Sequence, residues 1–372
     1  MHIQIYTMTH KKFSVPPDPM YVPLQVGSAV HEPLGYLRDD SGENISAQNC
    51  YYAELTGMYW VWKNVFDADY VGVCHYRRYL LNELGFVYTK KELEQLLQHY
   101  DILTSMKLKL NFSYEYGFTV NHTKKDLDAA DTVIQELYPD FYPLYRKRIQ
   151  ENHTYFGNLM ICSKKLYDEY CSFLFPIFAN MHKLLQLDSY DEYHKRLYGF
   201  LSEFLLMVWT EYRGLKVREC KVGMIGAKNE TGEVVEQMLS LFAEKKVEDA
   251  KTYFLSCYQK RPDILMEASD IDGHLHLCLE AVSVFEYESL HRMEKIPITE
   301  GKETLFGYLE QLNEAVLALT GNTYGAAETE RLKDERYSVY AIAVSVKLYA
   351  GQEQKAVCAQ IDTLCQRKIP LL

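Results

Sequence analysis

Residues 70–81 read YVGVCHYRRYLL, a short apolar run that leads directly into a histidine and two arginines. The run 70–74 is rich in residues that favour a buried strand. His75, Arg77 and Arg78 then stand where this strand would leave its sheet. In open α/β sheets, ligands bind in the crevice outside the carboxyl ends of the strands. The stretch therefore predicts a central strand with a cationic binding site at its end.

Other short, β-rich segments accompany this strand within residues 1–226, and helical patterns lie between them. These segments are His2–Tyr6, Asp101–Leu103, Leu159–Cys162 and Leu215–Val217. The clearest helix is expected from Ser46 to Val65, where apolar residues recur at helical spacing on one face. Buried strands that alternate with helices predict an α/β fold with a mostly parallel, Rossmann-like sheet covered by helices on both faces.

The sequence changes character after Gly226. GAKNETGE, residues 226–233, is typical of a linker, and the residues that follow are helix-forming and acidic. We expect a second domain at 227–372 that is entirely helical. Two segments, 250–262 and 348–356, partly match a tetratricopeptide unit, so a degenerate repeat is an alternative to a simple bundle.

Composition limits the function classes. The 372 residues are 48% hydrophobic and 24% charged, which is typical of a globular protein. No run of 18 apolar residues, secretory signal or C-x-x-C pair occurs among them, so we expect a cytoplasmic location with no membrane span, no disulfide framework and no zinc site. A formal net charge of −11 argues against a nucleic-acid partner. The common hydrolase, P-loop and dinucleotide motifs are absent from the sequence.

The arginine pair suits an anionic ligand. Guanidinium groups form planar, permanently charged forks that match phosphate, and His75 adds a further donor. A pyrophosphate is the natural ligand, and the alternative is that one arginine pairs with a buried carboxylate. Strand alternation would place His75 and Arg77 on one side, and Tyr76 and Arg78 on the other.

Asp67-Ala68-Asp69 spells the D-x-D motif by which many nucleotide-sugar enzymes hold Mn²⁺ or Mg²⁺. These aspartates precede the strand, so we expect them at its amino end, away from the binding crevice, in a solvated turn. Asp270-Ile271-Asp272 has the same spelling but falls in the predicted helical domain. Neither is expected to bind a metal.

Glu203 is the candidate general base. It lies in RLYGFLSEFLLMVW, residues 196–209, where Ser202 is expected to cap a helix that begins after the glycine. A glutamate in the first turn of a helix interacts favourably with the helix dipole, which would explain its position without any catalytic role. The apolar residues that follow would instead bury it and raise its pKa, as a base requires. The residues leave both interpretations open.

Further polar residues stand among aromatic ones and are secondary candidates. Each residue taken alone is more often a helix cap or a satisfied buried group than a ligand. We take Asn44 and Asn49 as candidate donor contacts, and His122, Asp126 and Asn158 as candidate contacts to the acceptor or sugar.

Together these stretches resemble one family, the bacterial capsular and exopolysaccharide glycosyltransferases whose domain carries an H-Y-R-R-Y core and was long catalogued as a domain of unknown function. The matching pieces run in the family's order over about residues 1–222 and leave out the helical remainder. They are THKKF (9–13), YVPLQVG (21–27), LGYLRDDSGENIS (34–46), AELTGMYWVWKN (53–64), DYVGVCHYRRYL (69–80), DIL (101–103), YPDFYPLY (138–145), GNLMICSKKLYDEYCSFLF (157–175) and GFLSEFL (199–205).

The resemblance implies a GT-A-like hexosyltransferase that uses a nucleotide-diphosphate sugar. Some relatives are thought to use UDP-galactofuranose with inversion. It places Thr9 and His10 near the nucleotide base. It also implies that His75 and the two arginines replace the D-x-D motif, which favours a site without a metal and leaves Mn²⁺ or Mg²⁺ as the alternative. Glu203 falls where the family has its presumed base.

Two departures qualify the resemblance: Phe204 stands where the family commonly has arginine, and Leu159 replaces a usual methionine. The acceptors of such enzymes are glycans or lipid-linked oligosaccharides, which implies peripheral contact with the inner membrane face. A rival interpretation is a sugar- or nucleotide-binding protein without turnover, with the helical domain as an assembly module.

Overall fold

The computed structural model describes residues 1–225, 229–265 and 269–372. The chain divides into two compact units, Met1–Ile225 and Gly226–Leu372. Sequence analysis placed the boundary after Gly226. Unit 1 contains all the strands of the described residues, and each unit is described by itself below.

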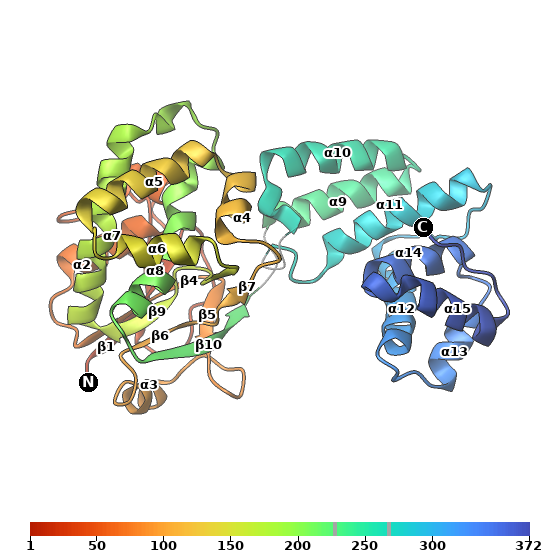
Figure 1. Ribbon diagram of the computed structural model, residues 1–372, viewed down its shortest axis with the longest axis horizontal. Coiled ribbons are helices and arrows are strands. Elements are labelled where there is room, and N and C mark those ends of the chain that lie inside the picture. The colour runs from red at the N-terminus through yellow and green to blue at the C-terminus, as the bar shows by residue number, and fades with distance from the viewer. Residues whose placement is uncertain (226–228, 266–268) are drawn as a thin grey trace. The chain divides into compact units, whose positions relative to one another are not determined.

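Unit 1 is built on an eight-stranded sheet with the order β3-β2-β1-β4-β5-β10-β6-β9 (Figure 1). Its strands are β1 (Ile3–Thr9), β2 (Tyr21–Gln25), β3 (Leu37–Arg38), β4 (Tyr70–His75), β5 (Arg78–Leu81), β6 (Ile102–Ser105), β9 (Met160–Ser163) and β10 (Val217–Met224). A separate two-stranded sheet pairs β7 (Leu108–Lys109) with β8 (His153–Thr154). Each of the five strand segments expected from the sequence overlaps one of these strands.

The sheet is mixed, so the prediction of a mostly parallel sheet is only partly correct. Strands β3, β2, β1 and β4 are parallel, as are β10 and β6. Strand β5 is antiparallel to β4 and β10, and β9 is antiparallel to β4 and β6. Because β4 pairs with β9 as well as β5, the strands β4, β5, β10, β6 and β9 close into a ring. The parallel prediction fails because a hairpin follows β4 where a crossover helix was expected.

Helices cover both faces of the unit 1 sheet, as expected. They are α1 (Asn49–Tyr52), α2 (Leu55–Asn64), α3 (Lys90–Leu96), α4 (Tyr114–Asn121), α5 (Lys124–Leu137), α6 (Tyr142–Ile149), α7 (Lys164–Leu184) and α8 (Leu197–Tyr212). Strand β1 shows why: Tyr6 and Met8 belong to the core shared with most of these helices, and Ile3 and Ile5 point to the core that contains α3. Figure 1 shows α3 on the side of the sheet opposite α7 and α8.

The long helix expected from Ser46 to Val65 is broken. A 3-10 turn at Ser46–Gln48 leads into α1, and α1 ends before Ala53, whose backbone is left-handed with φ 47°. Helix α2 begins after Glu54. The Asn49 amide donates to the carbonyl of Ala53 at 2.7 Å. Such side-chain bonds to the backbone compete with the helical ladder, and the apolar spacing does not reveal them.

Unit 2 consists of helices in its described residues. They are α9 (Asn229–Ala243), α10 (Val247–Lys260), α11 (His274–Leu290), α12 (Lys302–Thr320), α13 (Ala326–Lys333), α14 (Val339–Tyr349) and α15 (Gln354–Cys365). They share one apolar core. Of the predicted linker, residues 226–228 lie outside the described residues, and 229–233 belong to α9. Whether the helices form a degenerate repeat stays a prediction.

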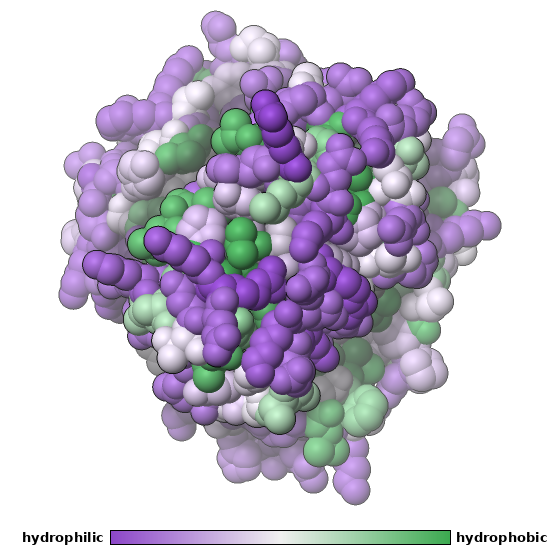
Figure 2. Space-filling model, turned by 90° about the vertical axis from the view of Figure 1, so that its right-hand side faces the viewer, coloured by the Kyte–Doolittle hydropathy of each residue, from purple (hydrophilic) through white to green (hydrophobic). Residues whose placement is uncertain are grey.

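The face of the helical unit that Figure 2 presents is mostly hydrophilic, with apolar residues scattered over it. Its core residues are instead enclosed between helices, as Leu309 and Leu312 of α12 show, since both are fully buried. Among the described residues of the chain, no helix is both long and apolar enough to cross a membrane.

Candidate functional site

The chain turns sharply at the end of β4. His75, the last residue of β4, pairs with Arg78, the first residue of β5, so Tyr76 and Arg77 form a two-residue turn. Residues directly opposite each other in an antiparallel pair point to the same side of the sheet. His75 and Arg78 therefore share a side, and the predicted alternation, which separated them, is wrong. It assumed that the strand continued.

The guanidinium of Arg78 lies over the ring of Phe156, 4.4 Å from its centroid. Among the described residues it has no hydrogen bond or ion pair, so Arg78 is not the structural partner of a buried carboxylate. The neighbouring Arg77 donates through Nε to the carbonyl of Ile225 at 3.3 Å. Arg78 thus presents a positive charge above the Phe156 ring, without an ion pair to any carboxylate of the described residues.

Glu203 lies within α8, which begins at Leu197, so the prediction that Ser202 caps this helix is wrong. The error came from treating Gly199 as a turn, whereas it is part of the helix. Glu203 Oε1 accepts a hydrogen bond from the backbone N–H of Gly157 at 2.7 Å. Gly157 has φ 92°, a left-handed conformation that favours glycine.

Burial raises the pKa of Glu203 to about 8, and the charge of Glu54 acts in the same direction. Arg78, the Gly157 N–H and Arg196 act in the opposite direction. A carboxyl group with a pKa close to neutral pH is suited to take up a proton. The environment therefore favours the base interpretation over that of a simple dipole partner.

Arg196 is a site residue that sequence analysis missed. It immediately precedes α8, is exposed, and lowers the pKa values of both His75 and Glu203 through its charge. Its guanidinium has no hydrogen bond or ion pair within the described part of the chain. Positions 196, 199 and 203 share one helical face, a spacing that could have revealed the arginine.

Glu54 and Asn158 form a second polar contact beside Glu203. The Asn158 amide donates to Glu54 Oε1 at 2.9 Å and to the carbonyl of Gly199 at 3.1 Å. Its oxygen accepts from the Ser202 hydroxyl at 2.8 Å. Asn158 is buried and left-handed, with φ 50°. Its amide thus joins α8 to the residue at the start of α2.

His75 is held in its neutral form. Loss of contact with water lowers its pKa well below the usual range, and the charges of Arg78, His10, Arg77 and Arg196 act in the same direction. Nδ1 accepts from the backbone N–H of Arg77 at 3.4 Å, which leaves the proton on the other ring nitrogen. His75 can therefore donate a hydrogen bond to a ligand without carrying a charge.

Thr9 and His10 follow β1, next to β4. The Thr9 hydroxyl is buried, donates to the carbonyl of Lys11 at 2.5 Å and accepts from its N–H at 3.1 Å, so it stabilises the local turn. The exposed His10 ring lies 5.4 Å from the ring of Tyr76. The structure thus brings His10 to the hairpin that carries His75 and Arg78.

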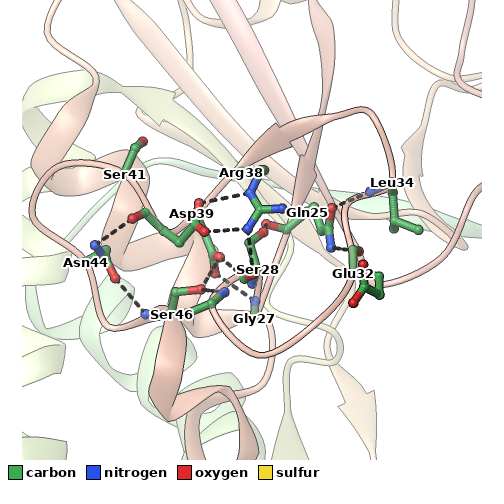
Figure 3. A network of polar contacts seen from close by, with 12 residues as sticks. Gln25, Gly27, Ser28, Glu32, Leu34, Arg38, Asp39, Ser41, Asn44 and Ser46 are labelled. Carbon is green, nitrogen blue, oxygen red and sulfur yellow. Dashed lines mark hydrogen bonds and ion pairs between the residues drawn. The ribbon is translucent and has the colours of Figure 1, made fainter.

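The loops after β2 and β3 converge on Asp39 (Figure 3). This buried carboxylate accepts from the backbone N–H groups of Gly27 and Ser28 at 3.0 and 2.9 Å. It also accepts from the hydroxyls of Ser46 and Thr56 at 2.5 and 2.6 Å. Sequence analysis did not single out Asp39, although it holds the loops at the carboxyl ends of the parallel strands.

Asn44 and Asn49, the other candidate donor contacts, are engaged in this loop region. The Asn44 amide donates to the carbonyls of Asp40 and Gly42, and its oxygen accepts from the N–H of Ser46. Asn49 donates to the carbonyl of Ala53. Both amides therefore have clear structural roles, and contact with a donor stays a prediction.

The family model described as "Domain of unknown function (DUF4422)" matches residues 4–214 of this chain. That range is more than half of the 372 residues. The chain belongs to the DUF4422 family. The match covers His75, Arg78, Arg196 and Glu203, and it ends before β10.

The DUF4422 protein is also similar to a solved structure titled "WbbM bifunctional glycosyltransferase apo structure". The TM-score is 0.54 at 26% sequence identity, over 61% of this chain. The DUF4422 protein covers only 46% of that chain. The search of curated proteins found no match to this protein.

Two of the candidate acceptor contacts of the DUF4422 protein lie in a separate cluster. His122 is buried next to the rings of Phe118, Tyr193 and Phe200, and neither ring nitrogen has a hydrogen-bond partner. Burial lowers its pKa to about 4. Asp126 forms a capping box with Thr123 at the start of α5 and accepts from the Tyr190 hydroxyl. Only Asn158 of these candidates contacts the Glu54 and Glu203 region directly.

The D-x-D residues of the DUF4422 protein lie just before β4, at its amino end. Asp69 accepts from the backbone N–H of His2 at 2.8 Å, and the Asp67 carbonyl contacts the His2 ring. Within the described ranges, no group of three or more His, Cys, Asp or Glu side chains is arranged to hold a metal. Asp67 and Asp69 therefore do not fit a metal site beside His75 and Arg78.

Proposed function

We propose that unit 1 is a glycosyltransferase that moves a sugar from a nucleotide-diphosphate donor to an acceptor hydroxyl. The observation that carries the proposal is the partly buried Glu203 carboxyl, which lies within electrostatic range of the Arg78 guanidinium without an ion pair between them. A base and a fixed cation are the two groups that such a transfer requires. The similarity to a glycosyltransferase structure supports the same class.

The proposed reaction is a single in-line displacement. The acceptor oxygen forms a bond to the anomeric carbon, and its proton passes to Glu203. The bond between that carbon and the diphosphate oxygen breaks, and its electron pair leaves with the diphosphate. Arg78, with Arg77 and Arg196, stabilises this negative charge, and neutral His75 donates a hydrogen bond to it. One carboxylate base suffices for inversion at the anomeric carbon.

The finer assignments rest on the family resemblance. We propose a GT-A-like donor site and a UDP-hexose donor, with UDP-galactofuranose as the specific candidate. The proposed acceptor is a growing capsular polysaccharide, exopolysaccharide or lipid-linked oligosaccharide. Because guanidinium groups stand beside Glu203, we propose that transfer needs no metal.

A donor screen on the full chain tests this proposal. A nucleotide that binds the folded protein raises its melting temperature, so UDP, GDP and dTDP are compared first, and then their sugars. We expect UDP to give the largest shift and a UDP-sugar with a glycan acceptor to release UDP. A chain that binds none of the nucleotides and turns over none of the sugars would overturn the proposal.

The metal-free site has its own test. EDTA should leave the rate of UDP release unchanged, because the charge of the leaving group is neutralised by side chains. Activity that disappears with EDTA and returns with Mn²⁺ would refute this part of the proposal.

A further inference from the structure

Glu54 lies at the break between two helices. Ala53, with its left-handed backbone, ends α1 and directly precedes Glu54. Glu54 then stands immediately before α2. Its carboxylate oxygens lie near Gly199 of α8, where a Cβ would be 3.9 Å from each of them.

One short turn holds both carboxylates of the site. Gly157 and Asn158 are consecutive left-handed residues, with φ 92° and 50°. The backbone N–H of Gly157 donates to Glu203, and the side chain of Asn158 donates to Glu54 Oε1. Two adjacent residues in an uncommon conformation thus position two acidic groups, which suggests a functional constraint.

The second oxygen of Glu54 has no partner. Asn158 occupies Oε1, and Oε2 makes no hydrogen bond or ion pair with any residue that the structure describes. Gly199 adds no side chain next to this oxygen. Glu54 is only partly buried, so Oε2 remains available as a hydrogen-bond acceptor.

A hydroxyl-bearing ligand fits this oxygen better than a cation does. Arg78 and Arg196 both act electrostatically on the adjacent Glu203, so a metal ion would face two positive groups. An anionic ligand would be repelled by the carboxylate itself. A neutral hydroxyl donates a hydrogen bond to a carboxylate without either penalty.

We propose that Glu54 Oε2 accepts a hydrogen bond from a hydroxyl of the bound sugar, and that Asn158 is the positioning residue that aims it. The inference rests on the proposed function and adds to it a residue that recognises the sugar part of the substrate. It separates the site into a cationic part for the diphosphate and an acidic part for the sugar.

The Glu54→Gln variant of the full chain tests this inference. Glutamine has the same size but places an NH₂ donor where one oxygen now accepts. We expect kcat/KM for the UDP-sugar to fall by about tenfold or more, since a hydrogen bond to a charged group is lost. The affinity for UDP alone should stay within about twofold, because UDP carries no transferred sugar. A kcat/KM that stays within about twofold of the parent would overturn the proposal.

The pH profile tests whether Glu54 lies beside the base. The negative charge of Glu54 raises the pKa of Glu203, so Glu54→Gln should move the acid limb of the pH profile of kcat/KM to lower pH. A residue remote from Glu203 would change the rate without moving the limb. An unmoved limb would therefore overturn the placement of Glu54 beside the base.

Asn158→Gly tests the positioning role without adding strain, because glycine adopts the left-handed conformation readily. We expect the same selective loss for the UDP-sugar with UDP affinity retained. Glu43→Gln is the matched control, since Glu43 is an exposed residue that contacts Tyr59 and Lys63. Equal losses of UDP and UDP-sugar binding in Asn158→Gly would contradict the assignment.

If Glu54→Gln does not fold, Glu54→Asp provides the second variant, because it keeps the charge but withdraws the oxygen by one methylene. It should lose sugar transfer and keep the parental acid limb. The parent chain distinguishes the two proposals: parental UDP binding and turnover with an unaffected Glu54→Gln variant would overturn only the role of Glu54. A parent that neither binds UDP nor turns over any sugar would overturn the proposed function instead.

Discussion

Each unit of this protein contains a glutamate with a raised pKa, but the surroundings differ. In unit 1, burial raises the pKa of Glu203 to about 8, although the charges of Arg78 and Arg196 act in the opposite direction. In unit 2, burial raises the pKa of Glu280 to about 7, and the opposing interaction is a hydrogen bond from Asn313. Glu280 lies on α11 with only 3% of its surface exposed.

The comparison shows that a raised pKa alone does not indicate a site. Glu280 is enclosed between helices: Asn313 of α12 donates to it and accepts in turn from Ser345 of α14. Glu203 is partly exposed and lies close to fixed cations. What distinguishes a candidate base is access for a substrate together with charges that can stabilise the other half of the reaction.

Glu203→Gln is the strongest test of this distinction. A glutamine cannot accept the proton, so transfer should fall by about 10²- to 10⁴-fold, the usual contribution of a general base. UDP affinity, measured by calorimetry, should change little, because the proposed phosphate contacts are Arg78 and His75. Glu280→Gln serves as the control and should keep the parental rate. Parental transfer by Glu203→Gln would refute the assignment of the base.

Arg78→Ala should give the next largest effect. Loss of a fixed positive charge beside the leaving group should lower kcat/KM by about 10²-fold, which is typical for one electrostatic donor. Arg78→Lys keeps the charge but not the planar group over Phe156, so it should recover only part of the rate. Arg146→Lys, which changes a residue paired with Asp131, is the control. Equal rates for Arg78→Ala and the parent would show that the diphosphate binds elsewhere.

Glu280→Gln should change the stability of the helical unit. Burial raises the folded-state pKa from 4.5 to about 7, so between these values the folded state holds a proton that the unfolded state has lost. The free energy of unfolding should therefore fall as pH rises through this window, by about 2 to 3 kcal/mol between pH 5 and pH 8. Above the window it should level off. The glutamine variant should lack this dependence.

Amide hydrogen exchange of α11 in the full chain measures the effect, with opening free energies compared at pH 5 and pH 8. Glu286→Gln is a suitable control because Glu286 is in the same helix but pairs with Lys251 at the surface. Identical opening free energies of the parent at both pH values would contradict the raised pKa of Glu280.

The pH dependence of transfer tests the same comparison without a substitution. The base must be ionised, and Glu203 in the free protein has its pKa raised to about 8. The value of kcat/KM should therefore increase by about tenfold per pH unit below pH 8 and level off above it. The residual activity of Glu203→Gln should lack this limb. A parental profile that is flat from pH 6 to pH 9 would exclude Glu203 as the titrating group.

The fold was only partly predictable from the sequence. Apolar runs such as 70–74 indicate strands because burial on both faces requires them. Strand β2 contains Pro23 and β3 has two residues, so neither produces a recognisable pattern. At the break, the Asn49 amide donates to the Ala53 carbonyl, and Thr56 of α2 donates to Asp39 from the loop after β3. Periodicity reports local burial and carries no information on such contacts.

The site was predictable where local chemistry is unusual. Adjacent arginines after a strand and a glutamate among apolar residues single out the pair Arg77 and Arg78, together with Glu203, as candidates. Glu54 and Arg196 were missed as site residues because each looks like an ordinary charged residue in the sequence. They join the site only through the turn at 157–158 and the start of α8. The contact of Glu54 with Asn158 joins distant segments and has no signature in a single sequence, whereas helical spacing from Glu203 could have revealed Arg196.

The closed ring of strands has a practical consequence for dissecting this protein. The family match ends at residue 214, but β10 begins at Val217 and lies between β5 and β6. A recombinant fragment cut at the end of the match would leave the backbone edges of both neighbours without partners and prone to self-association. During synthesis, likewise, the ring cannot close until its last strand has left the ribosome.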